Sequence, residues 1–365
     1  MSMMNELASL RSENGKRKEN FFVRFFKYFI PWKGDGFSEI MRKLVFAASI
    51  VVFCVSLSDL SDYLNGNAKT NELIEEIQSI KPAQITNDNA QSVQHPDDGN
   101  NDSSVEAPPT QQPGGEQLNT TIGENWGPLL AINDDVIGWI SIDTFKSSSG
   151  EVYIDYPVVK GEDNDYYLER DIKNNYSGSG GTIFMDYASS IVPGERTDNI
   201  TIFGHNMKAG TFFARLEEYK SGVNFLKSNP LITFNTLYST SDEKYIIVYC
   251  SLFSIYEDQD NGNVFKYVGY RDFDEEHPFE TWKEELSKRS WYSSGIDVSE
   301  DDEFITLSTC TNDIANMRWV IVARKLRPNE DVDALVQTYQ DRPNEDIYFP
   351  QRWIYSWGHK KVYRN

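Results

Sequence analysis

Cysteine is scarce in this sequence of 365 residues, which contains only three. Three thiols cannot form the disulfide network that holds many small secreted domains together, so the fold depends on an apolar core. Aromatic residues make up 13% of the chain and can supply that core. A single Cys250–Cys310 disulfide is formally allowed, but the two residues lie in separate buried-strand patterns and one bridge would not define the fold.

Basic residues are also few. The chain has 35 Lys and Arg against 56 Asp and Glu, a net charge of −21 that is unevenly spread. Residues 1–58 contain nine basic and five acidic residues, a net of +4, so the remaining residues carry −25. This acidic remainder excludes nucleic-acid binding, because contacts to phosphates require clustered cations.

Long apolar runs are limited to one uncharged stretch at residues 44–58. Extended to residues 40–60, it would form a transmembrane helix of about 31 Å that contacts the lipid bilayer. Arg42 and Lys43 lie within its first residues and before the uncharged run, which predicts a single pass with the N-terminus in the cytoplasm. A cleaved signal peptide is the alternative, although the segment before the apolar run is long for one.

Composition divides the rest of the chain. Residues 1–39 are predicted to form a basic and aromatic cytoplasmic segment, and residues 61–80 a polar helical stalk. Residues 81–123 have almost no large apolar side chains, which predicts a disordered linker. A folded domain is expected at 124–327, followed by a C-terminal extension at 328–365 for which the sequence indicates no role.

Short β-prone segments separated by turn residues dominate the folded domain. They predict a mainly β fold, either a barrel or a sandwich. Two helical patterns interrupt them, at 211–220 and at 278–289, and the second lies in the long segment before Cys310. The eight β-prone segments are 136–142, 152–159, 181–186, 199–204, 231–234, 244–249, 304–310 and 318–323.

Cys310 differs from the other two cysteines because it ends a β-prone run, and Arg318 begins the next run eight residues later. A free thiol is mostly protonated at neutral pH, so a nucleophilic cysteine needs neighbours that favour the thiolate. A guanidinium can stabilise an oxyanion, although an arginine on such a strand is also commonly a solvated side chain. Cys250 fits the simpler interpretation of a small buried apolar residue.

His205 is the candidate partner among four histidines, because it directly follows the strand pattern at 199–204. An imidazole in that position can exchange protons with a thiol and an amine. Taken alone, a histidine at a strand end is more often structural. The others lie in the predicted linker, in a charged loop and near the end of the chain: His95, His277 and His359.

These residues resemble motifs of the sortase family of cysteine transpeptidases. Residues 306–310, Thr-Leu-Ser-Thr-Cys, are similar to the TLxTC motif around the sortase nucleophile. Residues 201–206, Thr-Ile-Phe-Gly-His-Asn, are similar to the strand-end Gly-His-Asn motif that contains the sortase histidine, and Arg318 matches the sortase arginine. The resemblance covers roughly residues 126–326 with the motifs in the family's order.

Two further features resemble class B sortases. One is Asp-Tyr-Pro-Val-Val at 155–159 followed by residues 164–168, and the other is the helix in the segment 254–303 before the cysteine strand. The resemblance implies an eight-stranded sortase-like β-barrel with short helices. It also implies a membrane-anchored enzyme on the outer face of a Gram-positive cell.

The resemblance assigns roles to individual residues. Cys310 would attack the threonine carbonyl of a C-terminal sorting motif and form a thioacyl-enzyme. His205 would act as general acid and base, and Arg318 would stabilise the oxyanion or position the substrate. Thr309 and Asn206 would contact the substrate.

The implied partners are surface proteins that carry a sorting motif, and an amine from a peptidoglycan cross-bridge or a pilin lysine. A pilin-polymerising sortase is therefore one alternative, another extracellular Cys/His cell-wall peptidase is a second, and a membrane-tethered scaffold domain a third. No cofactor or metal is expected. Asp258, Asp260 and Asn261 raise the idea of a Ca²⁺ loop, but a solvated loop explains them better.

Overall fold

The structure is a computed structural model that describes residues 21–83, 122–177, 180–257 and 260–363. Contacts divide the chain into two units, Met1–Ala68 and Lys69–Asn365. Most of the predicted linker lies outside the described residues.

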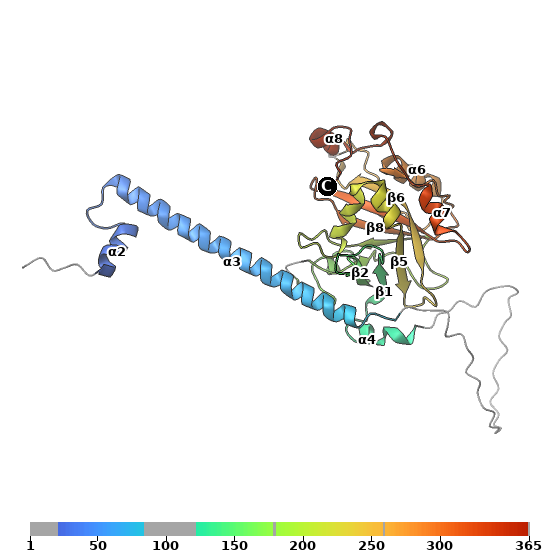
Figure 1. Ribbon diagram of the computed structural model, residues 1–365, viewed down its shortest axis with the longest axis horizontal. Helices are drawn as coiled ribbons and strands as arrows, with labels where there is room; N and C mark the ends of the chain where they lie inside the picture. Colours follow the sequence, from blue (N-terminus) through green and yellow to red (C-terminus); the bar gives the residue numbers. More distant parts are fainter. Residues whose placement is uncertain (1–20, 84–121, 178–179, 258–259, 364–365) are drawn as a thin grey trace, which may run out of the picture. The chain divides into compact units, whose positions relative to one another are not determined.

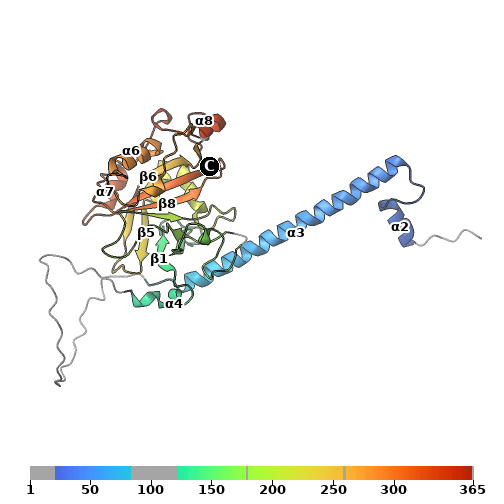
Figure 2. The same cartoon turned by 180° about the vertical axis from the view of Figure 1, so that it is seen from behind.

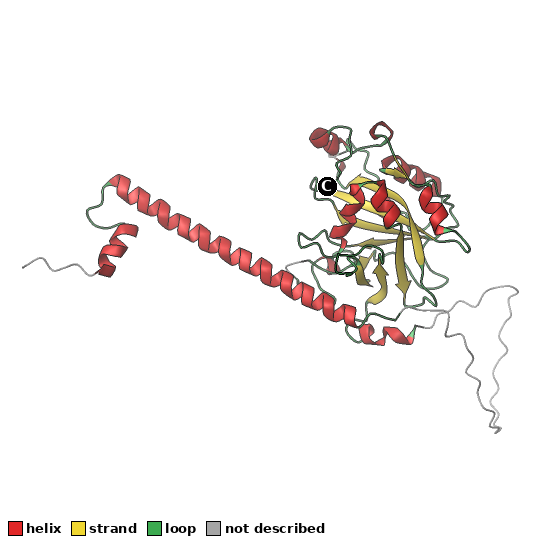
Figure 3. Cartoon of the chain, viewed as in Figure 1, coloured by secondary structure: helices red, strands yellow, loops and turns green. Residues whose placement is uncertain are grey.

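In the described part of the second unit, eight strands close into a barrel in the order β1-β2-β3-β4-β8-β9-β6-β5 (Figures 1 and 3). Each of the eight β-prone segments overlaps one of these strands, so the predicted mainly β barrel is confirmed. The pairs β2–β3 and β4–β8 are parallel, and the other neighbours are antiparallel. The barrel strands are β1 (Val136–Ser141), β2 (Asp155–Val159), β3 (Phe184–Met185), β4 (Asn199–Phe203), β5 (Leu231–Thr236), β6 (Lys244–Ser254), β8 (Phe304–Cys310) and β9 (Met317–Lys325).

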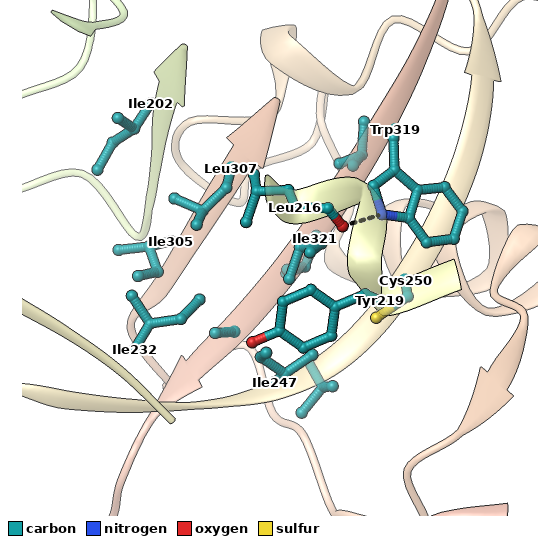
Figure 4. Packing of buried hydrophobic residues seen from close by; sticks show 14 of the residues in the cluster. Ile202, Leu216, Tyr219, Ile232, Ile247, Cys250, Ile305, Leu307, Trp319 and Ile321 are labelled. Atoms are coloured by element: carbon teal, nitrogen blue, oxygen red, sulfur yellow. Dashed lines mark hydrogen bonds between the residues drawn. The ribbon is translucent and has the colours of Figure 1, made fainter. Parts of the chain in front are cut away.

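Strands β8 and β9 are buried on both faces except at their ends, which explains their nearly continuous apolar sequence. Figure 4 shows Leu216 and Tyr219 among the side chains of β4, β8 and β9 in the core. On another side, Trp282 packs on Phe304 with ring centroids 4.8 Å apart. The strand that carries Cys310 is therefore held between two packed layers.

Short helices connect the strands, and the two helical patterns expected from the sequence are both present. The pattern at 211–220 forms a 3₁₀ helix, η4, and the pattern at 278–289 forms the α-helix α6. In both views α4 lies at the opposite end of the barrel domain from α8 (Figures 1 and 2). The helices up to β8 are η2 (Glu124–Trp126), α4 (Gly127–Leu130), η3 (Tyr166–Leu168), η4 (Phe213–Ser221), α5 (Val223–Ser228), η6 (Tyr267–Gly269) and α6 (Phe279–Arg289).

The C-terminal extension is folded onto the barrel domain. Its strand β10 (Gln340–Asp341) pairs with β7 (Tyr292–Ser293) in a separate two-stranded sheet. The Tyr339 hydroxyl donates a hydrogen bond of 2.6 Å to the carbonyl oxygen of Ile247 in β6. The other elements of the extension are α7 (Val332–Gln337), η7 (Asn344–Asp346) and α8 (Gln351–Trp357).

The helix α3 (Phe37–Ser79) covers both the predicted transmembrane segment and the predicted stalk, and it is apolar and long enough to cross a membrane. Its last turns belong to the second unit, where Ile77 is 2% exposed in a small core with Trp126 and Leu129. The end of the predicted polar stalk is thus part of the packed domain, because its few apolar side chains fill a cluster beside β1.

The described residues of the first unit form a helical hairpin. The helix α2 (Phe21–Phe29) precedes α3, and the buried Lys43 ammonium joins the two. Lys43 Nζ donates to the carbonyl oxygen of Lys27 at 2.6 Å and to Asp35 Oδ2 at 2.7 Å. These bonds satisfy a carbonyl near the end of α2, which would otherwise lack a helical partner.

Candidate active site

Cys310 and Arg318 face each other across an antiparallel strand pair. Cys310 is the last residue of β8 and is exposed, while Arg318 is half-buried near the start of β9. The two are direct partners in the register, so their side chains leave the same face of the sheet. Directly opposed residues have Cα atoms about 4.5–5.5 Å apart, which places the guanidinium within reach of a group bound at the thiol.

His205 reaches the same place through the parallel pairing of β4 with β8. Phe203 is the register partner of Ser308, and the Gly204 N–H donates a hydrogen bond of 3.2 Å to the Ser308 carbonyl. His205 is two residues beyond Phe203, and Cys310 is two residues beyond Ser308, so the same alignment places His205 next to Cys310. Asn206 closes the arrangement, because its Nδ2 donates to the Cys310 carbonyl at 2.7 Å.

The imidazole of His205 is oriented by the backbone. Its Nε2 lies 2.7 Å from the carbonyl oxygen of Leu168, at the end of η3. A carbonyl oxygen only accepts hydrogen bonds, so Nε2 carries a proton in this arrangement. No sequence signal pointed to Leu168 as the residue that fixes this ring.

Thr309 and Asn206, for which the sequence predicts substrate contacts, make internal hydrogen bonds. Thr309 is buried, and its Oγ1 donates to the Gly204 carbonyl at 2.8 Å. Asn206 Oδ1 accepts from Asn312 Nδ2 at 3.1 Å while Nδ2 holds the Cys310 carbonyl. Both side chains tie the histidine segment to the cysteine segment, and their contact with substrate stays a prediction.

Tyr267 is a buried residue beside the site that the sequence did not reveal. Its hydroxyl lies 2.8 Å from Ser308 Oγ, two residues before Cys310. Burial raises the pKa of the Tyr267 phenol, and the hydrogen bond with Ser308 and the charge of Arg318 oppose that shift. The phenol therefore stays neutral at physiological pH and supports β8 from the segment that precedes α6.

Cys250 lies in the interior of β6 and is buried, as its apolar surroundings in the sequence indicated. Burial raises the pKa of its thiol, so it is an inert thiol at neutral pH. All three cysteines are free, and Cys310 is exposed while Cys250 is not.

Asp260, one of the residues considered for a Ca²⁺ loop, is hydrogen-bonded to the C-terminal extension. Asp260 Oδ1 accepts hydrogen bonds from the Tyr348 hydroxyl at 2.7 Å and from the Gln351 backbone N–H at 3.2 Å. Asp258 lies outside the described residues. Within the described ranges, no group of three or more His, Cys, Asp or Glu side chains is arranged to hold a metal ion.

The chain is similar to known proteins in both sequence and fold. A family model for the sortase domain matches residues 149–326. Sortase B of Listeria monocytogenes is 33% identical over 194 residues, which cover 53% of this chain and 70% of that protein. Sortase B of Staphylococcus aureus is 28% identical over 201 residues, covering 54% of this chain and 73% of that protein.

Among solved structures, the fold is similar to sortase B from Bacillus anthracis in complex with AAEK1. The TM-score is 0.51 at 22% sequence identity, and the match covers 72% of this chain and 99% of the other. At this identity the likeness concerns the fold, which is an eight-stranded barrel with a few helices in both cases.

Proposed function

The chain belongs to the sortase family of cysteine transpeptidases and to its class B, and from this premise we propose that it cleaves a C-terminal sorting motif after threonine and transfers the protein to a cell-surface amine. Sortases act on substrates that carry sorting motifs. The observation that supports the residue assignment is the register, which pairs Cys310 with Arg318 and aligns β4, the strand before His205, with β8.

In the first half-reaction, the Cys310 thiolate attacks the carbonyl carbon of the threonine in the sorting motif. Arg318, directly across from Cys310, stabilises the negative charge that develops on the carbonyl oxygen. The carbon–nitrogen bond breaks as His205 gives a proton to the leaving amine, and a thioester on Cys310 remains.

In the second half-reaction, an amine attacks the thioester carbonyl. His205 takes a proton from the attacking amine, and the sulfur of Cys310 leaves as thiolate. The product is a new amide bond, and the enzyme returns to its starting state. The amine would come from a peptidoglycan cross-bridge or, in a pilin-polymerising variant, from a lysine of the partner protein.

The cellular arrangement follows from α3. The uncharged run at 44–58 lies within this helix, with Arg42 and Lys43 before it, so the N-terminus would stay in the cytoplasm and the barrel domain would lie outside the cell. A tethered enzyme at the outer face meets its substrate proteins as they emerge from the membrane.

Replacing the nucleophile tests the proposal. Cys310→Ala should abolish both peptide cleavage and amine transfer, whereas Cys250→Ala, at a buried thiol, should retain turnover per folded molecule. His205→Ala and Arg318→Ala should each lose several orders of magnitude without unfolding. The measurement is mass spectrometry of the protein incubated with a library of NPxTx-like and xPxTG-like peptides. Near-normal turnover of Cys310→Ala, or an acyl group trapped on another residue, contradicts the assignment.

A further inference from the structure

A buried ion cluster lies next to the residue that follows Cys310. The side chains of Lys220 and Glu217, both in η4, have no solvent-exposed surface. Lys220 Nζ donates to Glu217 Oε1 at 2.8 Å, to Thr311 Oγ1 at 2.6 Å and to Asp313 Oδ2 at 2.6 Å. The ammonium has three N–H donors, so each of them has an acceptor.

Two of these acceptors belong to the turn between β8 and β9. Thr311 directly follows Cys310, and its backbone N–H donates to the Met317 carbonyl at 3.1 Å, which closes the turn just before Arg318. The Thr311 hydroxyl accepts from Lys220 and donates to Asp313 Oδ2 at 3.0 Å. The ammonium is therefore bonded to the short loop whose two ends carry Cys310 and Arg318.

The helix η4 also bonds to His205 itself and to the residue after Arg318. The Phe213 N–H donates to the His205 carbonyl at 3.0 Å. Trp319, the residue after Arg318, donates from Nε1 to the Leu216 carbonyl at 3.0 Å, the bond drawn in Figure 4. Lys220 Nζ lies 5.0 Å from the centre of the Trp319 ring. One short helix is thus bonded to the backbone of His205 and to the side chains of Thr311 and Trp319, the residues that follow Cys310 and Arg318.

Packing alone does not account for a charge in this place. Removing an ammonium from water costs several kcal/mol, and a well-packed apolar side chain of similar size often stabilises a protein as much or more. A fully satisfied buried network does fix geometry, because each bond has a direction and a broken one leaves an unpaired group. The cluster is therefore better explained by a need to fix the conformation of the β8–β9 turn than by stability alone.

We propose that Lys220 is a positioning residue for the transpeptidase reaction, which holds the β8–β9 turn so that Cys310 and Arg318 keep the separation that catalysis requires. Because its side chain is fully buried, Lys220 acts through the turn and does not touch the substrate. The inference rests on the proposed roles of Cys310 and Arg318.

Lys220→Met tests this in the full-length protein in detergent micelles. The substrate is the library peptide that wild type turns over fastest, and hydroxylamine is the acceptor. Folded enzyme is counted as the fraction of molecules in which the buried Cys250 stays protected from alkylation, measured by mass spectrometry. We expect kcat per folded molecule to fall about 10- to 100-fold, because small misplacements of reacting groups have effects of this size. KM should change less than about threefold, because no substrate contact is removed.

Lys227→Met is the matched control, since Lys227 lies in the neighbouring α5 and is only half-buried. It should keep wild-type kcat. If Lys220→Met does not fold, Asp313→Asn and Thr311→Val weaken the same network more gently and should lower kcat about 3- to 10-fold. A purely structural role would lower the amount of folded enzyme and leave kcat per folded molecule unchanged, which would overturn the proposal.

A double-mutant cycle adds a second criterion. If Lys220 acts through the placement of Arg318, then Lys220→Met should have a much smaller effect in the Arg318→Ala background than in wild type. Full multiplication of the two effects would contradict the inference. That failure differs from failure of the proposed function, which would appear as activity of Cys310→Ala.

Discussion

At the scale of single residues, Gly204, which precedes His205, has no room for a side chain. A Cβ atom added to Gly204 would lie 2.6 Å from the ring of Phe213, closer than such atoms approach in folded proteins. Gly204 also donates its N–H to Ser308 and accepts from Thr309 Oγ1. Only glycine allows this close approach, so its presence at this position has a steric reason.

Gly204→Ala should therefore displace either Phe213 or the segment that carries His205. We expect a loss of about 1–3 kcal/mol in the free energy of unfolding, as for other overpacked sites, together with a lower kcat. Gly127→Ala is the control, because nothing lies within 4 Å of its Cβ position. Urea unfolding and peptide turnover measure both effects, and equal stability of the two variants would contradict the steric account.

At the scale of elements, the C-terminal extension is bound to the segment between β6 and β8, which contains α6 and β7. The extension pairs with β7, and its Tyr348 hydroxyl and Gln351 backbone N–H donate hydrogen bonds to Asp260. Its Trp353 ring packs beside Trp291, with ring centroids 6.0 Å apart. The extension thus braces residues between β6 and β8. Its own helix α8 is held by one fully buried tryptophan.

Substitutions of two tryptophans in α8 test how much the extension contributes to stability. Trp353 is 0% exposed and Trp357 is 37% exposed. Trp353→Ala should lower the free energy of unfolding by about 3–5 kcal/mol, because it leaves a cavity in the core, whereas Trp357→Ala should cost much less. Chemical denaturation of the two variants gives the comparison. A similar small loss in both would show that the extension contributes little to the fold.

At the scale of the whole molecule, the barrel domain includes the last turns of α3. Ile77 is buried there, and Lys81 Nζ donates to Asp155 Oδ1 at 2.5 Å, next to the 2.6 Å bond from Trp139 Nε1 to the same oxygen. Gln78 adds a hydrogen bond of 3.0 Å to the Asp155 carbonyl. The boundary of the domain therefore lies near Lys69, before the end of the predicted stalk.

Truncations on either side of this boundary should differ. A fragment that starts at residue 69 should be soluble, active and as stable as the domain in the full chain. A fragment that starts at residue 84 should be less stable by about 2–5 kcal/mol, the usual cost of removing one large aliphatic side chain from a core. Thermal and urea unfolding decide between them, and equal stability would place the boundary after the stalk.

Much of the fold was predictable because the signals are local. Runs of β-branched and aromatic residues between turn residues marked all eight barrel strands, and the position of Cys310 and His205 at strand ends needed only those runs. The apolar run within α3 was equally clear. These features depend on residues that are close together in the sequence, so the sequence by itself determined them.

Contacts between distant segments were decided only by the tertiary structure. His205 and Leu168 are 37 positions apart in the sequence, and Lys220 and Thr311 are 91 apart. The bond from Tyr339 in the extension to Ile247 joins residues 92 positions apart. No periodicity records such pairs, because each depends on how the barrel closes. The sequence therefore determined which strand ends carry the thiol, the imidazole and the guanidinium, and barrel closure decided that these ends meet, since hydrogen-bond register between strands is a property of the assembled sheet.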